Sequence, residues 1–285
     1  NGYLCSAPDD YGTSYYYRGN VTNNYVKFGD YYWRIIRING DGSIRIIYDG
    51  TSAHANGESS TDRQVGESAY NSSYNDNAYV GYMYGTVGSD SYEGTHSNTN
   101  DSTIKAYLDN WYKTNIEDKG LSSYISDTLF CNDRSFNEVN TGTGAGTSTT
   151  RYRWRYGPWD STGSQYPRLT CSNQNDRFTV DDEVAGNGDL TYPIGLVTTD
   201  EVVLAGGYST NNSGYYLYTG NSYWTMSPSY LVGSHATVRG VDSRGSAGNY
   251  YDVNYSFGVR PTLNVVASAF KYGDGTMNNP YRMTE

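Results

Sequence analysis

The sequence predicts an α+β fold with a mixed or antiparallel sheet, two or more helices and long polar loops. Two observations indicate this class: strand-like segments lie at both ends of the chain, and two helix-like segments lie between them. Runs of β-branched and aromatic residues are typical of strands, whereas apolar residues three and four positions apart are typical of amphipathic helices. Because the helices are segregated from the strands, we expect the N-terminal and C-terminal strands to pair in one sheet.

The clearest strands lie within residues 25–50. The segment YYWRIIRI at 31–38 carries apolar residues on both faces, with Trp33 on one and Ile36 on the other, so it predicts a central strand. The tetrad NGDG at 39–42 follows it, and Asn and Gly tolerate positive φ. We therefore expect a hairpin between this strand and the next one.

Two helices are expected in the middle of the chain. The segment IKAYLDNWYKTNI, which starts at residue 104, has apolar residues at i, i+3, i+4 and i+7, and the preceding DST at 101–103 offers an N-cap. A shorter helix is expected over 198–205, where Thr198 or Thr199 can cap an acidic first turn and Gly206 can end the helix.

The composition points to an extracellular binding protein rather than a nucleic-acid or membrane protein. The net charge is -10, which disfavours nucleic acid as a partner, and no apolar run is long enough to insert into a membrane. Only 18% of residues are charged, and 33 are tyrosines. Tyrosine with Ser, Gly and Asn is also the mixture that antibody-like binding surfaces use. A secreted protein with long polar loops is the plainer alternative.

The chain starts at Asn1 without a methionine, so it is either a processed form or a cut fragment. We expect an export or anchor segment to have been removed and the protein to lie outside the cell or on its surface. In an exported chain, Cys131 and Cys171, which flank a long polar loop, form a plausible disulfide, and Cys5 is left over.

The sequence offers little machinery for catalysis or metal binding. Its three histidines are scattered among loops, and no Gly-x-Ser-x-Gly elbow or Ser/His/Asp set is present. We therefore expect no enzyme activity and no cofactor. Calcium is the one metal considered, because several oxygen donors lie within ten residues, although a solvated acidic loop is the alternative. These weak calcium candidates are Asp181, Asp182, Asn187 and Asp189.

Two motifs near the C-terminus carry a resemblance. The segment YWTMSP at 223–228, followed by FGVRPTLN at 257–264, resembles a set of uncharacterised surface domains of gut-type Gram-positive bacteria. Those domains are similar to the C-type-lectin-like fold, in the branch that also holds formylglycine-generating enzymes and the variable proteins diversified by retroelements. The segments 25–50 and 192–207, and the helix that contains Trp111, are similar too.

The resemblance implies one domain over 1–285, with an N-terminal β region (1–50), helices and long loops (51–210) and a C-terminal β region with a display loop (211–285). It also implies that the residues between Ser-Pro and Gly-Val-Arg-Pro face a ligand. The chain has no cysteine after Cys171, which argues against formylglycine chemistry, and it lacks the Glu-Pro-Asn or Gln-Pro-Asp motifs of calcium-dependent lectins.

Two sets of residues follow from this resemblance and from the residue types. Structural roles are expected for Trp33, Trp111, Trp224, Arg260 and Pro261. The candidates for ligand binding are Tyr230, His235, Arg239, Asp242, Arg244, Asn249, Tyr250, Tyr251, Asn254 and Tyr255. The alternative for each of these ten is an ordinary solvated loop position.

We therefore expect a non-enzymatic, adhesin-like module of a bacterial surface protein, which binds a protein or a glycan on another cell. The alternative is a structural subunit of a pilus or another extracellular filament, whose partner is a neighbouring subunit. High Tyr, Asn and Gly with few charges would suit the contacts of either one.

Overall fold

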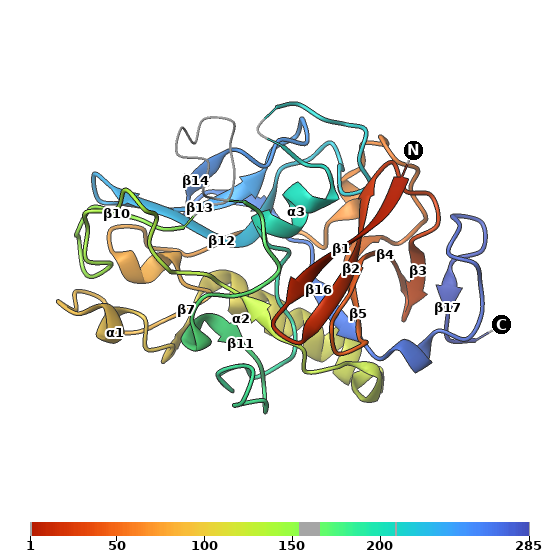
Figure 1. Cartoon of the computed structure of the whole chain (residues 1–285), viewed down its shortest axis with the longest axis horizontal. Helices are drawn as coiled ribbons and strands as arrows, with labels where there is room; N and C mark the ends of the chain where they lie inside the picture. Colours follow the sequence, from red (N-terminus) through yellow and green to blue (C-terminus); the bar gives the residue numbers. More distant parts are fainter. Residues whose placement is uncertain (1, 154–165, 209, 285) are drawn as a thin grey trace.

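The structure, a computed structural model that describes residues 2–153, 166–208 and 210–284, consists mostly of β-sheet with a few short helices (Figure 1). Two mixed sheets dominate it, so the predicted α+β class is confirmed. Figure 1 shows α2 packed below and between the two sheets, with both ends of the chain on the same side of the molecule.

The larger sheet joins the two ends of the chain. Its strands are ordered β1-β2-β4-β3-β17, with β5 beside β4 and β16 beside β5. The strands are β1 (Gly2–Asp9), β2 (Gly12–Gly19), β3 (Tyr25–Phe28), β4 (Tyr31–Ile38), β5 (Ile44–Gly50), β16 (Thr262–Val265) and β17 (Tyr281–Arg282). Strand β16 runs antiparallel to β5, and β17 runs parallel to β3. The predicted pairing of N-terminal with C-terminal strands is therefore confirmed.

Strand β4 is central, as the apolar residues on both of its faces predicted. It pairs with β5 along one edge and with β3 and β2 along the other. Trp33 and Ile36 are both buried, on opposite faces. The turn that joins β4 to β5 is the predicted hairpin, with Gly42 at a φ of 86° that glycine adopts without strain.

The second sheet is built mainly from the last third of the chain. Its strands are ordered β14-β13-β12-β15-β6, and β10 pairs with β12. The strands are β6 (Glu67–Ala69), β10 (Thr150–Arg151), β12 (Tyr223–Val232), β13 (His235–Val241), β14 (Tyr250–Asp252) and β15 (Ser256–Gly258). Strands β6 and β10 lie far from the others in the sequence, and neither was predicted.

Three α-helices and two short ribbons complete the described structure. The helices are α1 (Tyr92–Thr95), α2 (Thr103–Tyr112), which continues as a π-helical turn (Lys113–Glu117), and α3 (Thr199–Ala205). The ribbons pair β7 (Met83–Tyr84) with β8 (Asn100–Asp101), and β9 (Phe130–Cys131) with β11 (Arg177–Phe178). Single 3-10 turns cover Thr61–Arg63, Asn77–Val80, Ser122–Tyr124, Gln174–Asp176 and Ala267–Ala269.

Both predicted helices are confirmed together with their caps. The Ser102 side chain caps α2 by accepting from the Lys105 N–H. Helix α3 starts with a complete capping box, in which Thr198 and Glu201 bond each other's backbone, and it ends at Gly206 in the left-handed conformation.

The main core lies between the two sheets and α2. Trp33 of the first sheet and Trp224 of the second are fully buried in the same cluster as Ile104 and Leu108 of α2. Trp111 is partly buried and packs edge-on against Trp33 at 6.0 Å. The α2 side chains thus fill the space between the sheets, as their helical spacing predicted.

Arg260 and Pro261 are buried beside β5, where Asp49 gathers three arginines. The Arg260 guanidinium donates to the carbonyls of Tyr48 and Leu217, and to Asp49 at 3.0 Å. Arg63 lies 2.8 Å and Arg34 3.9 Å from the same carboxylate. All four charged side chains are almost completely buried, so Asp49 is the shared counter-charge that makes this part of the core possible.

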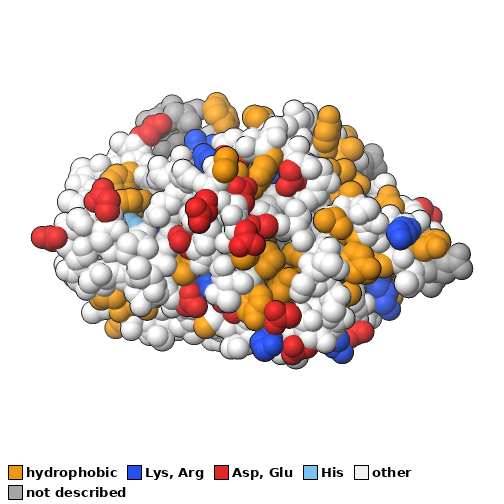
Figure 2. All heavy atoms as spheres, turned by 90° about the horizontal axis from the view of Figure 1, so that it is seen from below, with side chains coloured by type: hydrophobic (Ala, Val, Ile, Leu, Met, Phe, Trp, Pro, Cys, Tyr) orange, Lys and Arg blue, Asp and Glu red, His pale blue; other side chains and the backbone are white. Residues whose placement is uncertain are grey.

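The surface is polar mainly through uncharged groups. The face shown in Figure 2 is dominated by backbone and uncharged polar side chains, with carboxylates scattered over it and small apolar patches between them. This agrees with the low fraction of charged residues in the sequence.

Candidate functional site

A hairpin formed by β12 and β13 supports the candidate site. Its two-residue turn, Gly233-Ser234, has positive φ at both positions (58° and 66°), which matches the twist of the flanking strands. Strand β14 pairs with the outer edge of β13, and β10 pairs with β12. These four strands of the second sheet lie in the upper left of Figure 1.

The side chains of this sheet alternate between the core and the surface. Leu231, Ala236, Val238 and Val253 are completely buried in the main core. The neighbouring side chains point to the opposite face, because successive residues of a strand alternate. That outer face forms a groove of about 480 Å³, which is lined by Arg151, Tyr230, Val232, His235, Thr237, Tyr250 and Asp252.

Two tyrosines form the aromatic wall of the groove. The rings of Tyr230 and Tyr250 meet edge to face, with their centres 4.9 Å apart. Arg239 of β13 is buried beside them, and its guanidinium carbon lies 5.7 Å from the Tyr230 ring centre and 5.2 Å from the Tyr250 ring centre. Arg151 approaches Tyr230 to 5.8 Å. The two guanidinium groups hold the aromatic rings in place by cation–π contacts.

Burial lowers the pKa of Arg239 to about 10, and the neighbouring tyrosines partly oppose this shift. The guanidinium therefore stays charged at neutral pH. It also donates to the Gly248 carbonyl, which ties the floor of the groove to the loop that precedes β14. The groove is thus a fixed feature of the strands rather than of a mobile loop.

Hydrogen-bonding groups line the rest of the groove. His235 Nδ1 lies 2.7 Å from Asp252 Oδ2, and the ring of Tyr74 packs against the imidazole at 5.0 Å. The Thr237 hydroxyl exchanges hydrogen bonds with the Tyr230 backbone across the hairpin. The carboxylate and the imidazole are therefore oriented before any ligand arrives.

A histidine–aspartate pair is also the base and orienting group of many hydrolases. Among the described residues, however, no serine or cysteine hydrogen-bonds the His235 ring, so no nucleophile is placed against it. Of the other histidines, His54 lies buried between Glu58 and Asp62, and burial holds the pKa of His96 well below its usual value.

The structure brings four of the ten candidate residues to the groove face, namely Tyr230, His235, Arg239 and Tyr250. Tyr251 lies on the opposite face, where its ring packs against Phe257 at 4.5 Å. Asn254 and Tyr255 lie exposed in the turn between β14 and β15.

The remaining three candidates form a separate cluster in the loop after β13. The Asp242 carboxylate is buried and accepts hydrogen bonds from Arg244, Ser246 and Asn249. These bonds close the loop on itself, which is a structural role. The cluster is not part of the groove.

Several groove residues were not recognised in the sequence: Tyr74, Arg151, Val232, Thr237 and Asp252. Thr237 and Asp252 could have been found, because they alternate with core residues on strands that already held candidates. Tyr74 could not, because it lies in a distant segment and nothing local marks its position.

The calcium candidates make local hydrogen bonds. Asp182 accepts from the backbone of Val184 and Ala185, and Asp189 accepts from the Asn98 side chain. Asn187 bonds the Asp189 N–H, and Asp181 is exposed. Over the described ranges, no group of three or more His, Cys, Asp or Glu side chains is arranged to hold a metal ion.

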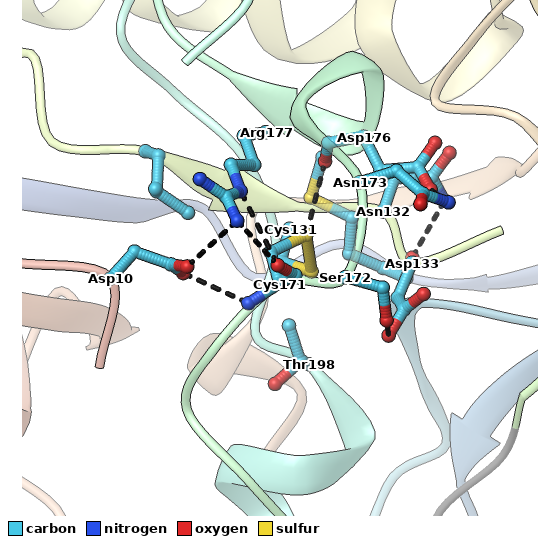
Figure 3. The surroundings of a disulfide bond; sticks show 12 residues. Asp10, Cys131, Asn132, Asp133, Cys171, Ser172, Asn173, Asp176, Arg177 and Thr198 are labelled. Carbon is cyan, nitrogen blue, oxygen red and sulfur yellow. Dashed lines mark hydrogen bonds and ion pairs between the residues drawn. A yellow bond between two sulfur atoms is a disulfide. The ribbon is translucent and has the colours of Figure 1, made fainter. Parts of the chain in front are cut away.

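The predicted disulfide between Cys131 and Cys171 is present and lies at one side of a charged cavity (Figure 3). Figure 3 shows Asp10 facing Arg177 and the backbone of Cys171. The Asp10 carboxylate accepts from the Cys171 N–H at 2.9 Å and pairs with Arg177 at 3.3 Å, while Arg177 donates to the Cys171 carbonyl. Beside the disulfide, both the N–H and the carbonyl of Cys171 are therefore hydrogen-bonded.

This cavity is lined by a network of ion pairs. Glu201 pairs with Arg37 at 2.9 Å and Arg45 at 3.1 Å, and Arg153 pairs with Asp133 at 2.7 Å. Its volume of about 20 Å³ is enough for a single water molecule. We assign it a structural role.

Asp200 in this network gives the first testable prediction. Burial raises the pKa of Asp200 to about 7. The folded protein then holds a proton that the unfolded chain releases near the ordinary value of 3.8, so the stability from this group is lost as the pH rises through about 7. We expect Asp200→Asn to gain stability relative to the unmodified protein as the pH rises from about 5 to about 8, because only the unmodified protein loses this contribution. Urea titrations at several pH values measure this, with the exposed Asp181→Asn as control. Equal slopes of the free energy of unfolding against pH in Asp200→Asn and in the unmodified protein would contradict the prediction.

No protein-family model, curated protein or solved structure matches this chain. Its similarity to the C-type-lectin-like fold therefore stays a prediction. Within the described ranges, no helix is both long and apolar enough to cross a membrane.

Proposed function

We propose that this protein is a non-enzymatic, adhesin-like binding module of a bacterial surface, and that it takes its ligand in the groove walled by Tyr230 and Tyr250. The observation that carries the proposal is the groove itself: two fixed aromatic rings beside oriented hydrogen-bonding groups. Aromatic walls with a few convergent polar groups are the usual construction of small-ligand sites.

A glycan is the ligand class that this geometry favours over a folded protein. The volume of about 480 Å³ falls within the range of small-ligand sites, about 300–1,000 Å³. Stable binding of a folded protein instead buries a surface of about 800 Å² on each partner. The tyrosine rings offer apolar faces to the C–H groups of a sugar, while Asp252 and Thr237 offer partners for its hydroxyls.

The proposed fold is the C-type-lectin-like one. Two features support it: terminal strands that pair in one sheet, and the groove strands β13 and β14, which lie between the Ser-Pro and Gly-Val-Arg-Pro motifs. The proposed location is extracellular. The buried disulfide supports this, because such bonds persist in oxidising compartments.

The test is a glycan array followed by calorimetry with any sugar that binds. We expect Tyr250→Ala to weaken binding about tenfold to a hundredfold, as the loss of a central aromatic contact usually does. Tyr255→Ala is the matched control, because the two tyrosines are exposed to the same degree (52% and 51%) but only Tyr250 lines the groove.

Equal effects of the two substitutions would place the binding site elsewhere. If no glycan binds, a screen for protein ligands with the same pair of variants tests the other half of the proposal.

A further inference from the structure

Strand β1 ends the larger sheet with an unpaired edge. It hydrogen-bonds β2 along one side, from Gly2 opposite Gly19 to Asp9 opposite Gly12. On the other side, the only bridge within the described ranges is at its last residue, between Asp9 and Leu169. The edge from Gly2 to Ala7 is therefore open.

The register shows which backbone groups face outward. Asp9 and Gly12 close a two-residue turn and form a hydrogen-bonded pair, and such pairs alternate along an antiparallel hairpin. The N–H and C=O groups of Gly2, Leu4 and Ser6 therefore point away from β2. Pro8 is the next outward position, and because proline has no N–H it ends the usable edge.

Before Pro8, this edge lacks the usual protection against pairing. Natural edge strands are blunted by charged side chains or bulges, and β1 has no charged residue before Asp9 and no bulge in its register with β2. Tyr3 and Leu4 are 63% and 59% exposed. In a chain of net charge -10, an uncharged edge is also the place where a second copy can approach with least repulsion.

We propose that β1 pairs antiparallel with β1 of a second copy, about a twofold axis at Cys5. In this register the outward-facing Leu4 hydrogen-bonds Ser6 of the second copy. Tyr3 then lies opposite Ala7. Large side chains face small ones at both of these pairs, so the edge is complementary to itself in shape as well as in hydrogen bonding.

The twofold axis brings the two Cys5 residues face to face. Cys5 is a free thiol, and in this register it occupies a non-hydrogen-bonded pair, in which the Cα atoms are about 4.5 Å apart. That spacing lies within the range of disulfides. The axis does not involve the groove, because no groove residue belongs to β1, so the dimer would present two grooves and gain avidity for a repeated ligand.

The pairing is tested first by sedimentation under reducing conditions. We expect a dimer for the unmodified protein and for Leu4→Ala, and a monomer for Leu4→Pro at the same concentration. Both substitutions remove the exposed Leu4 side chain, but only proline removes the outward N–H. Circular dichroism and the melting temperature establish that the Leu4→Pro variant is folded. A monomeric unmodified protein at about 1 mM, or a folded Leu4→Pro variant that still dimerises, would overturn the proposal.

Oxidation tests the register. Oxidised glutathione takes two electrons and two protons from the two Cys5 thiols and leaves a Cys5–Cys5 disulfide and two molecules of reduced glutathione. We expect this cross-link in the unmodified dimer by non-reducing electrophoresis and peptide mass spectrometry. The double variant Cys5→Ser/Ser6→Cys should not cross-link, because residue 6 faces residue 4 of the second copy. Equal cross-linking of the two proteins would refute the axis at Cys5.

Discussion

Asp49→Asn is expected to destabilise the fold by about 3–5 kcal/mol, the usual loss when one partner of a buried ion pair is removed. The asparagine keeps the shape of the side chain but takes away the negative charge that Arg34, Arg63 and Arg260 share. Burial already lowers the pKa of Arg34 and Arg260, and Asp49 opposes that shift. Without it, three buried guanidinium groups lose their common counter-charge.

Urea denaturation followed by tryptophan fluorescence measures this loss. Asp181→Asn is the control, because it removes the same charge from an exposed side chain. If the two variants unfold with equal free energies, Asp49 is not the counter-charge of the cluster, and the arginines must be neutralised in another way.

Replacing both Cys131 and Cys171 by alanine is expected to reduce the free energy of unfolding by about 4 kcal/mol. The two cysteines are 40 residues apart, and in the chain-entropy model a cross-link of that span restricts the unfolded chain by this amount. The hydrogen bond that Asp10 accepts from the Cys171 N–H and the one that Arg177 donates to the Cys171 carbonyl remain in the double variant. We therefore expect a weakened fold rather than an altered one.

Cys5→Ala, measured at protein concentrations at which the chain is monomeric, is the control for this double variant. Cys5 is a free cysteine within the chain. A loss below about 1 kcal/mol in the double variant would mean that the polar contacts around Cys171, and not the covalent bond, hold the loop in place.

The elements with strong local signals were predicted correctly. The turn at 39–42, the caps of α2 and α3 and the central position of β4 all follow from contacts between neighbours in the chain. The disulfide followed from the number and placement of the cysteines. The pairing of β6 with β15 and of β10 with β12 was not predicted, because two- and three-residue strands carry no periodicity.

Lys105 shows a second kind of limit. It lies on α2 between apolar positions and would be expected at the surface, yet its side chain is buried between Asp101 at 3.1 Å and Asp109 at 2.7 Å. The same holds for Arg37 and Arg45, which share Glu201 of α3. Which charges are buried depends on partners that only folding brings together.

The sequence by itself determined the local elements and the bridged cysteines, and it pointed to the segment that holds most of the groove residues. The tertiary structure alone decided the groove. Tyr250 and Tyr251 are neighbours of the same type, but the register of β14 on β13 turns Tyr250 toward the groove and Tyr251 into the core. Arg151 reaches the groove beside Tyr230, from a strand some eighty residues before that tyrosine. Tyrosine suits both environments, so its side chain is placed by long-range pairing and not by its own preference.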